Sequence, residues 1–315
     1  MPPWFPTAPC TPGRCTAHPG TGHRAGDRVG RRPGTATAGP LRALARLAAG
    51  AGTVLLGVLL APGTAPLPSA TRLALVRCWA RTVVRAFGVR ARYTGNPAPA
   101  GPLLVVANHV SWLDVPLLAA VLPGRAVAKA EVRHWPVLGT LAALGGTLFV
   151  ERDRLRALPG TVRAVTGALA DGGRVVVFPE GSTWCGRAGG RFRPAVFQAA
   201  LDAGCAVQPV RIAYRPTEGA AYVGDDPLGA SLWRVVTTRR LTAEVHAADP
   251  LPGGRYPDRR ALAAAAERAV ARPAALRPAT AQRAVASDSA NLSPPSVHQR
   301  AMPRPAAASS SRTPS

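Results

Sequence analysis

Short apolar runs alternate with amphipathic stretches through the middle of the chain, from about residue 103 to residue 270. The run Leu103–Ala107 is continuous and rich in Val, which is typical of a strand buried on both faces. Similar runs predict further strands, and stretches with helical spacing that end at Gly or Pro predict helices between them. The predicted strands are Leu103–Ala107, Ala126–Lys129, Thr147–Val150, Arg174–Phe178, Val207–Ala213 and, as an edge strand, Leu241–His246; the predicted helices are Leu113–Val121, Thr161–Ala170, Ala195–Asp202 and Ala261–Val270. This alternation predicts an α/β fold with a mostly parallel or mixed sheet covered on both faces.

A different pattern precedes this region. Leu47–Ala61 is apolar and uncharged, which corresponds to about 22 Å of helix and is shorter than the roughly 30 Å hydrocarbon core of a bilayer. Ser69 is predicted to cap a second helix that extends to about Phe87. On that helix one face holds arginines and the opposite face holds apolar side chains: Arg77, Arg81 and Arg85 against Leu75, Val76, Trp79, Val83 and Phe87. Such a helix is typical of a membrane interface, although an ordinary surface helix packed on a core has the same pattern.

The two ends of the chain lack any such periodicity. Residues 1–40 are rich in Pro, Gly, Thr and Arg, and residues 273–315 form a low-complexity stretch with a Ser-rich end. We therefore expect a disordered leader at 1–40, a membrane-associated helical segment at 41–90, the α/β domain at 91–272 and a disordered tail at 273–315.

Composition narrows the function classes. The 47% hydrophobic content excludes a wholly disordered chain, and the absence of a series of long apolar runs excludes a polytopic membrane protein. The formal net charge is +23, of which +12 lies in residues 1–100 and +7 in residues 251–315, so the middle is nearly balanced. Only 5% of residues are aromatic and no basic–aromatic platform is visible, so the charge favours an anionic membrane surface over nucleic acid. Five scattered cysteines without a CxxC predict neither a zinc site nor a disulfide framework, which fits a reducing compartment.

The segment Asn108–Asp114 follows the first predicted strand, where α/β folds place their sites. An imidazole such as that of His109 can act as a general base near neutral pH. Asp114, five residues on, is placed to accept the other ring N–H and to hold the tautomer. Ser111 is predicted to cap the following helix. A polar loop whose His and Asp merely cap that helix remains the alternative.

Two further segments follow predicted strands. In Phe178-Pro179-Glu180-Gly181-Ser182, the Pro and Gly force a turn that presents Glu180 and the N–H groups near Gly181 and Ser182. In Phe149-Val150-Glu151-Arg152, Arg152 lies past a strand end and can reach a phosphate. Lys129, the only lysine of the chain, also ends a strand. Taken singly, each segment also fits an ordinary turn or a solvated cation.

Taken in order, Asn-His-x-Ser-x-x-Asp, Phe-Val-x-Arg, Phe-Pro-Glu-Gly-Ser and Val-x-Pro-Val resemble the four blocks of the glycerolipid acyltransferase family, which includes the bacterial 1-acylglycerol-3-phosphate acyltransferases. The resemblance covers about Leu41 to Val270. It implies an αβα acyltransferase fold preceded by an N-terminal membrane-docking helical segment. It also implies transfer of a fatty acyl chain from acyl-CoA or acyl carrier protein to the hydroxyl of a lysophospholipid, above all 1-acylglycerol-3-phosphate, which gives phosphatidate.

Carried over by position, the resemblance makes His109 the general base and Asp114 its partner. Lys129 and Arg152 would hold the acceptor's phosphate, and Glu180, Gly181 and Ser182 would shape the acceptor pocket. Backbone N–H groups near Ser111 are expected to stabilise the oxyanion. We expect no cofactor and no metal, since acyl-CoA or acyl carrier protein is a substrate.

Alternatives remain open at this point. Ser182-Thr183 stand where the family commonly has Thr-Arg, so lyso-ornithine lipid or another lysolipid is a possible acceptor, with Arg187, Arg191 or Arg193 replacing the missing cation. A thioesterase-type hydrolase could use the same His–Asp pair on water, although no Gly-x-Ser-x-Gly elbow is present. The expected location is the cytoplasmic face of the cell membrane, by a monotopic, re-entrant or single short anchor.

Overall fold

The computed structural model describes residues 10–11, 14–15, 37–98, 101–151, 155–224 and 226–272. The chain divides into two compact units, residues 1–273 and 274–315, and every element described below belongs to the first. The predicted tail and most of the predicted leader thus lie outside the described residues. Within the leader, the described elements include the short antiparallel strands β1 (Cys10–Thr11) and β2 (Arg14–Cys15).

A seven-stranded mixed sheet forms the centre of the described fold, in the order β3-β9-β8-β4-β7-β5-β6. Its strands are β3 (Arg90–Gly95), β4 (Leu103–Ala107), β5 (Arg125–Lys129), β6 (Leu148–Val150), β7 (Arg174–Val177), β8 (Ala206–Arg215) and β9 (Thr242–Ala247). Only β8 and β9 pair antiparallel, and the other neighbours are parallel. The carboxyl ends of β4, β5, β6, β7 and β8 therefore meet at one edge.

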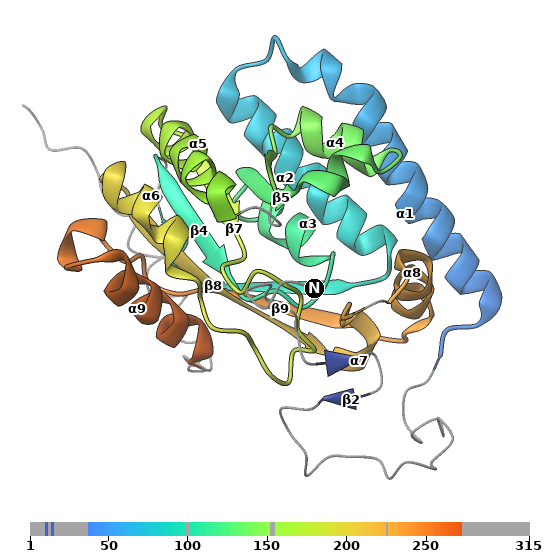
Figure 1. Ribbon diagram of the computed structural model, residues 1–315. Helices are drawn as coiled ribbons and strands as arrows, with labels where there is room; N and C mark the ends of the chain where they lie inside the picture. Colours follow the sequence, from blue (N-terminus) through green and yellow to red (C-terminus); the bar gives the residue numbers. More distant parts are fainter. Residues whose placement is uncertain are drawn as a thin grey trace, which may run out of the picture. The chain divides into compact units, whose positions relative to one another are not determined.

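Helices cover both faces of the sheet (Figure 1). One side carries α1 (Pro40–Leu60), α2 (Ser69–Ala86), α3 (Asp114–Ala119), α4 (Leu138–Leu144) and α8 (Leu228–Thr237); the other carries α5 (Leu158–Ala170), α6 (Phe197–Asp202) and α9 (Arg259–Ala271). The short helix α7 (Thr217–Ala220) follows β8, and the 3-10 turn η3 (Ala130–His134) follows β5. Along β4, Leu103, Val105 and Ala107 enter the first core, whereas Leu104 and Val106 enter the second. The predicted αβα architecture is confirmed.

Most predicted elements of the α/β domain are present, with bounds displaced by a few residues at most, but two predictions need correction here. The strand predicted at the edge is β9, which lies between β3 and β8. One edge is β3, a strand that was not predicted although its first four residues, Arg90-Ala91-Arg92-Tyr93, alternate between polar and apolar. Ser69 does not cap α2: it is the first helical residue, and the preceding Pro68 makes no side-chain capping bond. Helices α4 and α8 were also not predicted.

The N-terminal helices α1 and α2 form a hairpin that is attached to the α/β domain. The Arg46 guanidinium donates to the carbonyls of Val236 (2.8 Å) and Thr238 (3.1 Å). The Trp79 indole N–H donates to a carbonyl of α1 at 2.9 Å. A Cβ at Gly57 would lie 2.4–2.9 Å from that indole, so only glycine allows this close approach. The first helix is thereby held against the second and against the domain.

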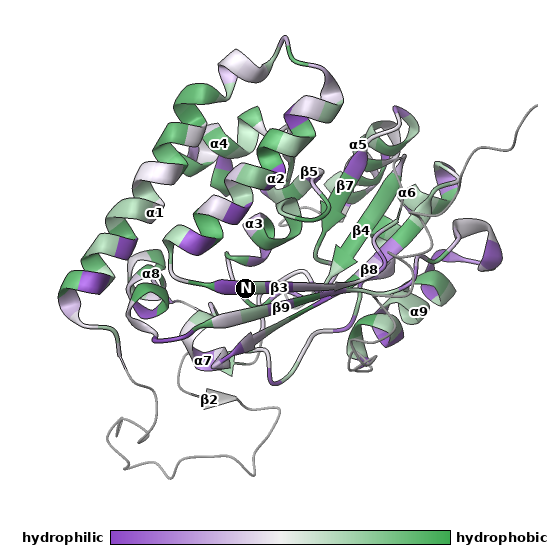
Figure 2. Ribbon diagram, turned by 180° about the vertical axis from the view of Figure 1, so that it is seen from behind, coloured by the Kyte–Doolittle hydropathy of each residue, from purple (hydrophilic) through white to green (hydrophobic). Residues whose placement is uncertain are grey.

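Helix α1 is long and apolar enough to cross a membrane, and it is the one such helix in the described part of the chain. Figure 2 shows it as a largely hydrophobic ribbon with hydrophilic residues toward one end. Several of its large apolar side chains are exposed, among them Leu41, Leu55, Leu56, Leu59 and Leu60. A helix with this surface can anchor the protein to a membrane.

Candidate active site

The loop that follows β4 is held in register by Asn108. Its side-chain amide donates to the Ile212 carbonyl (2.9 Å), and its side-chain oxygen accepts the Ile212 N–H (2.8 Å). These two bonds continue the pairing of β4 with β8, which ends at Ala107 opposite Val210. The next residue, His109, is thus delivered at the carboxyl edge of the sheet, where the sequence predicted it.

His109 and Asp114 form a hydrogen-bonded pair. The Nδ1 atom of His109 lies 2.8 Å from Oδ2 of Asp114, a carboxylate with no exposed surface. The same oxygen accepts the N–H groups of Val110 (2.7 Å) and Ser111 (2.9 Å). Because a carboxylate only accepts, Nδ1 carries the proton and Nε2 is left with the lone pair. This arrangement can accept a proton from a substrate hydroxyl.

The His109 ring is also fixed on its face and through its backbone. It stacks on Phe178 with centroids 3.9 Å apart and planes 14° apart. Its carbonyl accepts the Trp184 N–H at 2.7 Å. Two segments after β7, at residues 178 and 184, therefore close around the histidine.

Glu180 is buried behind this loop rather than turned into an open pocket. Its Oε2 accepts the His109 N–H (2.8 Å) and its Oε1 accepts the Gly190 N–H (3.1 Å). A Cβ at Gly189 would lie 2.9 Å from Oε1, so glycine lets the loop approach the carboxyl. Burial raises the pKa of Glu180 to about 8, against the opposing effect of these two hydrogen bonds. The geometry makes Glu180 a brace between two loops, whereas the sequence placed it in the acceptor pocket.

This raised pKa predicts a pH dependence of stability. Between about pH 4.5 and pH 8, Glu180 is protonated in the folded protein and ionised in the unfolded chain, so stability falls as pH rises through that window. We expect the melting temperature of the wild type to decrease from pH 5 to pH 8, and Glu180→Gln to remove part of that slope. The exposed Glu131→Gln is the matched control. Equal slopes in Glu180→Gln and in Glu131→Gln would contradict the assignment.

Ser111 and the backbone near it are already engaged. Ser111 is fully buried, and its Oγ accepts the Leu113 N–H (3.3 Å). The Val110 and Ser111 N–H groups bind Asp114, and the Asp114 N–H binds the Ser111 carbonyl (3.1 Å). The prediction that Ser111 caps the following helix is wrong: α3 begins at Asp114 with Leu113 at the N-cap and no side-chain capping bond, because the Ser111 hydroxyl accepts the N–H of Leu113, which precedes the helix. The N–H groups expected to face an oxyanion are instead turned inward.

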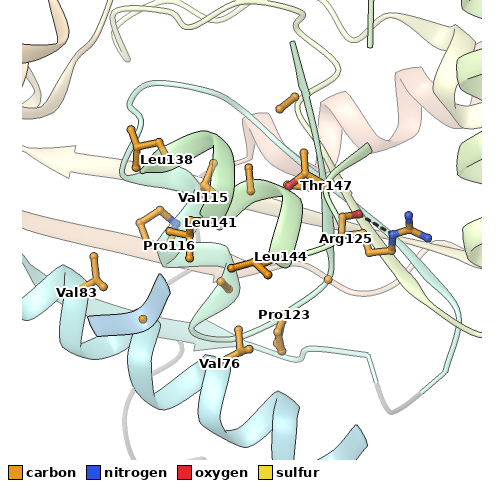
Figure 3. Close-up of a pocket in the computed structure, with 18 of the residues that line it drawn as sticks. Val76, Val83, Val115, Pro116, Pro123, Arg125, Leu138, Leu141, Leu144 and Thr147 are labelled. Carbon is orange, nitrogen blue, oxygen red and sulfur yellow. Dashed lines mark hydrogen bonds between the residues drawn. The ribbon is translucent and has the colours of Figure 1, made fainter. Parts of the chain in front are cut away.

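His109 lies on the wall of a large groove of about 2260 Å³ between the α1–α2 hairpin and the domain. Apolar side chains of α1, α2, α3 and α4 line most of it. Figure 3 shows Val76 and Val83 on one side and Leu138, Leu141 and Leu144 on the other. Arg125, whose Nε donates to the Gly146 carbonyl at 2.7 Å, lies at one end. The groove has the shape and lining of a site for a long hydrocarbon chain.

Polar residues also line the groove together with His109. They include Lys129, Glu131, Ser182 and Thr183, with Gly181 beside them, and the arginines Arg72, Arg77, Arg125 and Arg174. Lys129 ends β5, as predicted. Arg152 lies outside the described residues. Of the three arginines considered as substitutes on the loop after Thr183, none lines the groove as described, and Arg187 pairs with Glu218. The described residues include no cluster of three His, Cys, Asp or Glu side chains that could hold a metal.

Sequence reasoning missed one residue of this site. The Tyr214 hydroxyl donates to Oδ1 of Asp114 at 2.5 Å from a position 100 residues away in the chain. Tyr214 follows Val210 and Ile212 on one face of β8, so strand alternation predicts that its side chain points into the core. No local sequence pattern predicts that its hydroxyl binds Asp114.

Comparisons with known proteins agree with this geometry. The family model "Acyltransferase" matches residues 90–213. The lyso-ornithine lipid O-acyltransferase of Pseudomonas aeruginosa is 38% identical over 247 residues, which are 73% of this chain and 92% of the relative. The 1-acyl-sn-glycerol-3-phosphate acyltransferase of Neisseria gonorrhoeae is 40% identical over 48% of this chain and 62% of its own length.

A solved structure shows the same fold. The crystal structure of the 1-acyl-sn-glycerophosphate (LPA) acyltransferase PlsC from Thermotoga maritima aligns with a TM-score of 0.57 at 21% identity, over 81% of this chain and 97% of that one. Three findings agree: the fold, the matched family model and a relative that aligns over nearly its whole length. The chain belongs to the acyltransferase family and is an enzyme of that class.

Proposed function

We propose that this enzyme transfers a fatty acyl chain from a thioester donor, acyl-CoA or acyl carrier protein, to the free hydroxyl of a lysolipid. The leading acceptor is 1-acylglycerol-3-phosphate, which gives phosphatidate. The observation that carries the proposal is the His109–Asp114 pair (2.8 Å) on the wall of an apolar groove. The groove suits an acyl chain, and the pair suits the activation of an alcohol.

In the proposed reaction, Nε2 of His109 takes the proton of the acceptor hydroxyl while its oxygen attacks the thioester carbonyl. Asp114 keeps the proton on Nδ1 and stabilises the imidazolium that forms. The tetrahedral intermediate then expels the thiolate, which receives the proton from His109. An ester bond forms, a thioester bond breaks, and neither a covalent enzyme intermediate nor a cofactor or metal is required.

Ser182 and Thr183 are our candidates for donors to the oxyanion. They line the groove together with His109, whereas the N–H groups of residues 110, 111, 113 and 114 are bound inward. An oxyanion in a water-poor groove gains strongly from one or two fixed donors. Lys129 would hold the acceptor's phosphate, and Arg152 would assist.

Lyso-ornithine lipid is the second candidate acceptor. The P. aeruginosa relative that acts on it aligns over 92% of its length, more than the 62% of the N. gonorrhoeae relative. An ornithine headgroup carries an ammonium and a carboxylate, and the groove offers Glu131 as well as Lys129. A lining carboxylate suits such a headgroup better than it suits a phosphate.

We further propose that the protein lies on the cytoplasmic face of the membrane without crossing it. Arg46 is tied to carbonyls of the domain, so only residues 47–60 of α1 form an uncharged stretch, about 21 Å as a helix. This is short of the roughly 30 Å hydrocarbon core. The exposed Arg81 and Arg85 of α2 can meet anionic lipid headgroups.

The test supplies the purified full chain, in detergent–lipid micelles, with a panel of lysolipids and with each donor, and identifies products by mass spectrometry. We expect phosphatidate from lysophosphatidate, at a rate at least tenfold above that of lysophosphatidylcholine. If ornithine lipid is the main product, the acceptor is lyso-ornithine lipid and not 1-acylglycerol-3-phosphate. Release of free fatty acid without a diacyl product would indicate a hydrolase and overturn the proposal.

A further inference from the structure

The carboxylate of Asp114 is completely enclosed, and its two oxygens have different partners. Oδ2 accepts three N–H groups, from the His109 ring and from the backbone of Val110 and Ser111. Oδ1 accepts the Tyr214 hydroxyl at 2.5 Å. A buried carboxylate is stable only when its oxygens are hydrogen-bonded. Tyr214 therefore supplies the donor that the loop itself does not provide.

Strand β8 places this hydroxyl by its register with the catalytic loop. The Asn108 side chain binds both backbone groups of Ile212. Two residues further along, Tyr214 lies on the same face of the strand. Because β8 continues five residues past the last pairing with β4, its end lies beside the His109 loop. Two contacts therefore link the loop to this end of β8, one through Asn108 and one through Tyr214.

The protonation state of Tyr214 suits its role as a donor to Asp114. Burial and the neighbouring charge of Asp114 raise the pKa of Tyr214 well above its ordinary value. The phenol therefore stays protonated and remains a donor over the working pH range.

We propose that Tyr214 is a positioning residue for the general base: it fixes the Asp114 carboxylate in the rotamer that orients the His109 ring. The chain of contacts runs from Tyr214 to Asp114 and His109. The inference rests on the proposed acyl transfer with His109 as base. Tyr214 does not line the groove as described, so its loss changes the rate of the chemical step and not substrate binding.

The chain offers a matched control in Tyr93. It also packs against the first core, and its hydroxyl is buried without a hydrogen-bond partner in the described structure. Tyr214→Phe and Tyr93→Phe therefore remove the same atom from similar surroundings, and only the first removal breaks a contact with Asp114. We expect kcat of acyl transfer to fall about 10- to 100-fold in Tyr214→Phe, with both KM values unchanged. Tyr93→Phe should keep the wild-type kcat.

A spectroscopic readout separates positioning from a general loss of structure. The proton on Nδ1 of His109, bound to a carboxylate, is expected to give a downfield resonance in the proton NMR spectrum of the micelle-bound protein. The resonance should move or broaden in Tyr214→Phe and stay in Tyr93→Phe. If Tyr214→Phe does not fold, 4-fluorophenylalanine introduced at position 214 serves as the second variant, because it keeps the size of tyrosine but cannot donate to Asp114. The same loss in kcat at unchanged KM is expected.

The outcomes are distinguishable from failure of the proposed function. If His109→Ala retains full transfer, the base assignment itself is wrong. If His109→Ala is inactive while Tyr214→Phe matches Tyr93→Phe in kcat and in the resonance, only the role of Tyr214 is wrong. An increase in KM with unchanged kcat would likewise overturn it, because it would place Tyr214 in substrate binding.

Discussion

Replacing His109 with alanine is expected to lower the rate of acyl transfer by about 10³-fold or more while the protein stays folded. An alcohol is a poor nucleophile at neutral pH, and in the proposed mechanism His109 is the group that removes its proton. The loss should fall on kcat, since the hydrocarbon groove and the other polar groups on its wall remain. The measurement is the initial rate of diacyl product from a thioester donor and a lysolipid, with the melting temperature recorded alongside.

His246→Ala is the matched control for this experiment. His246 lies on β9, where its ring nitrogen is hydrogen-bonded to the Thr94 hydroxyl (3.1 Å), and it has no place in the groove. Its loss should leave transfer within about twofold of the wild type. Comparable activity of the two variants would remove the basis for general-base catalysis by His109.

The same assay separates transfer from hydrolysis. Both reactions could use the His109–Asp114 pair, but they differ in the species that loses a proton, the lysolipid hydroxyl or water. Wild-type protein should give diacyl product in large excess over free fatty acid, because a lysolipid bound in the groove would hold its hydroxyl at His109 and displace the water that hydrolysis needs.

The parts of this site that could be predicted are those encoded by short segments. The run Leu103–Ala107 is apolar at every position, so both faces of the strand are expected to be buried, and its bounds follow from the sequence alone. His109 and Asp114 are five residues apart at the end of that strand, and their contact depends only on the turn between them. For the same reason α3, α5, α6 and α9 could be placed to within a few residues.

Contacts between distant segments could not be predicted in this way. Glu180 follows a strand and carries a charge, so it resembles a residue exposed for binding. Its burial depends on the loop that returns at Gly190, and on glycine at 189 to admit it. Tyr214 is an inward residue of a long strand, and its bond to Asp114 depends on the register of β8 against β4. The edge position of β3 likewise depends on pairing order, which residue patterns do not encode.

Membrane association is expected to depend on the exposed leucines of α1. Leu55 and Leu59 are 48% and 75% exposed. Such apolar side chains are normally buried, so their exposure indicates a surface that contacts lipid. Burying a leucine side chain is worth about 1.5–3 kcal/mol. The double change to glutamine should therefore weaken membrane binding by about 3 kcal/mol, or roughly a hundredfold. Cell fractionation should move the variant from the pellet to the supernatant.

Two comparisons make this result specific. Leu158→Gln changes an exposed leucine on α5, on the opposite face of the sheet, and should leave the protein in the pellet. Washing wild-type membranes with about 1 M salt, which screens exposed charges within about 3 Å, should not release it, because apolar burial rather than arginine–headgroup attraction supplies most of the binding. Release by salt alone would instead assign the anchoring to the arginines of α2. Because Leu55 also lines the groove, activity of the leucine variant is measured both on vesicles and on a short-chain acceptor that is soluble without a membrane. The loss of activity should be larger on vesicles.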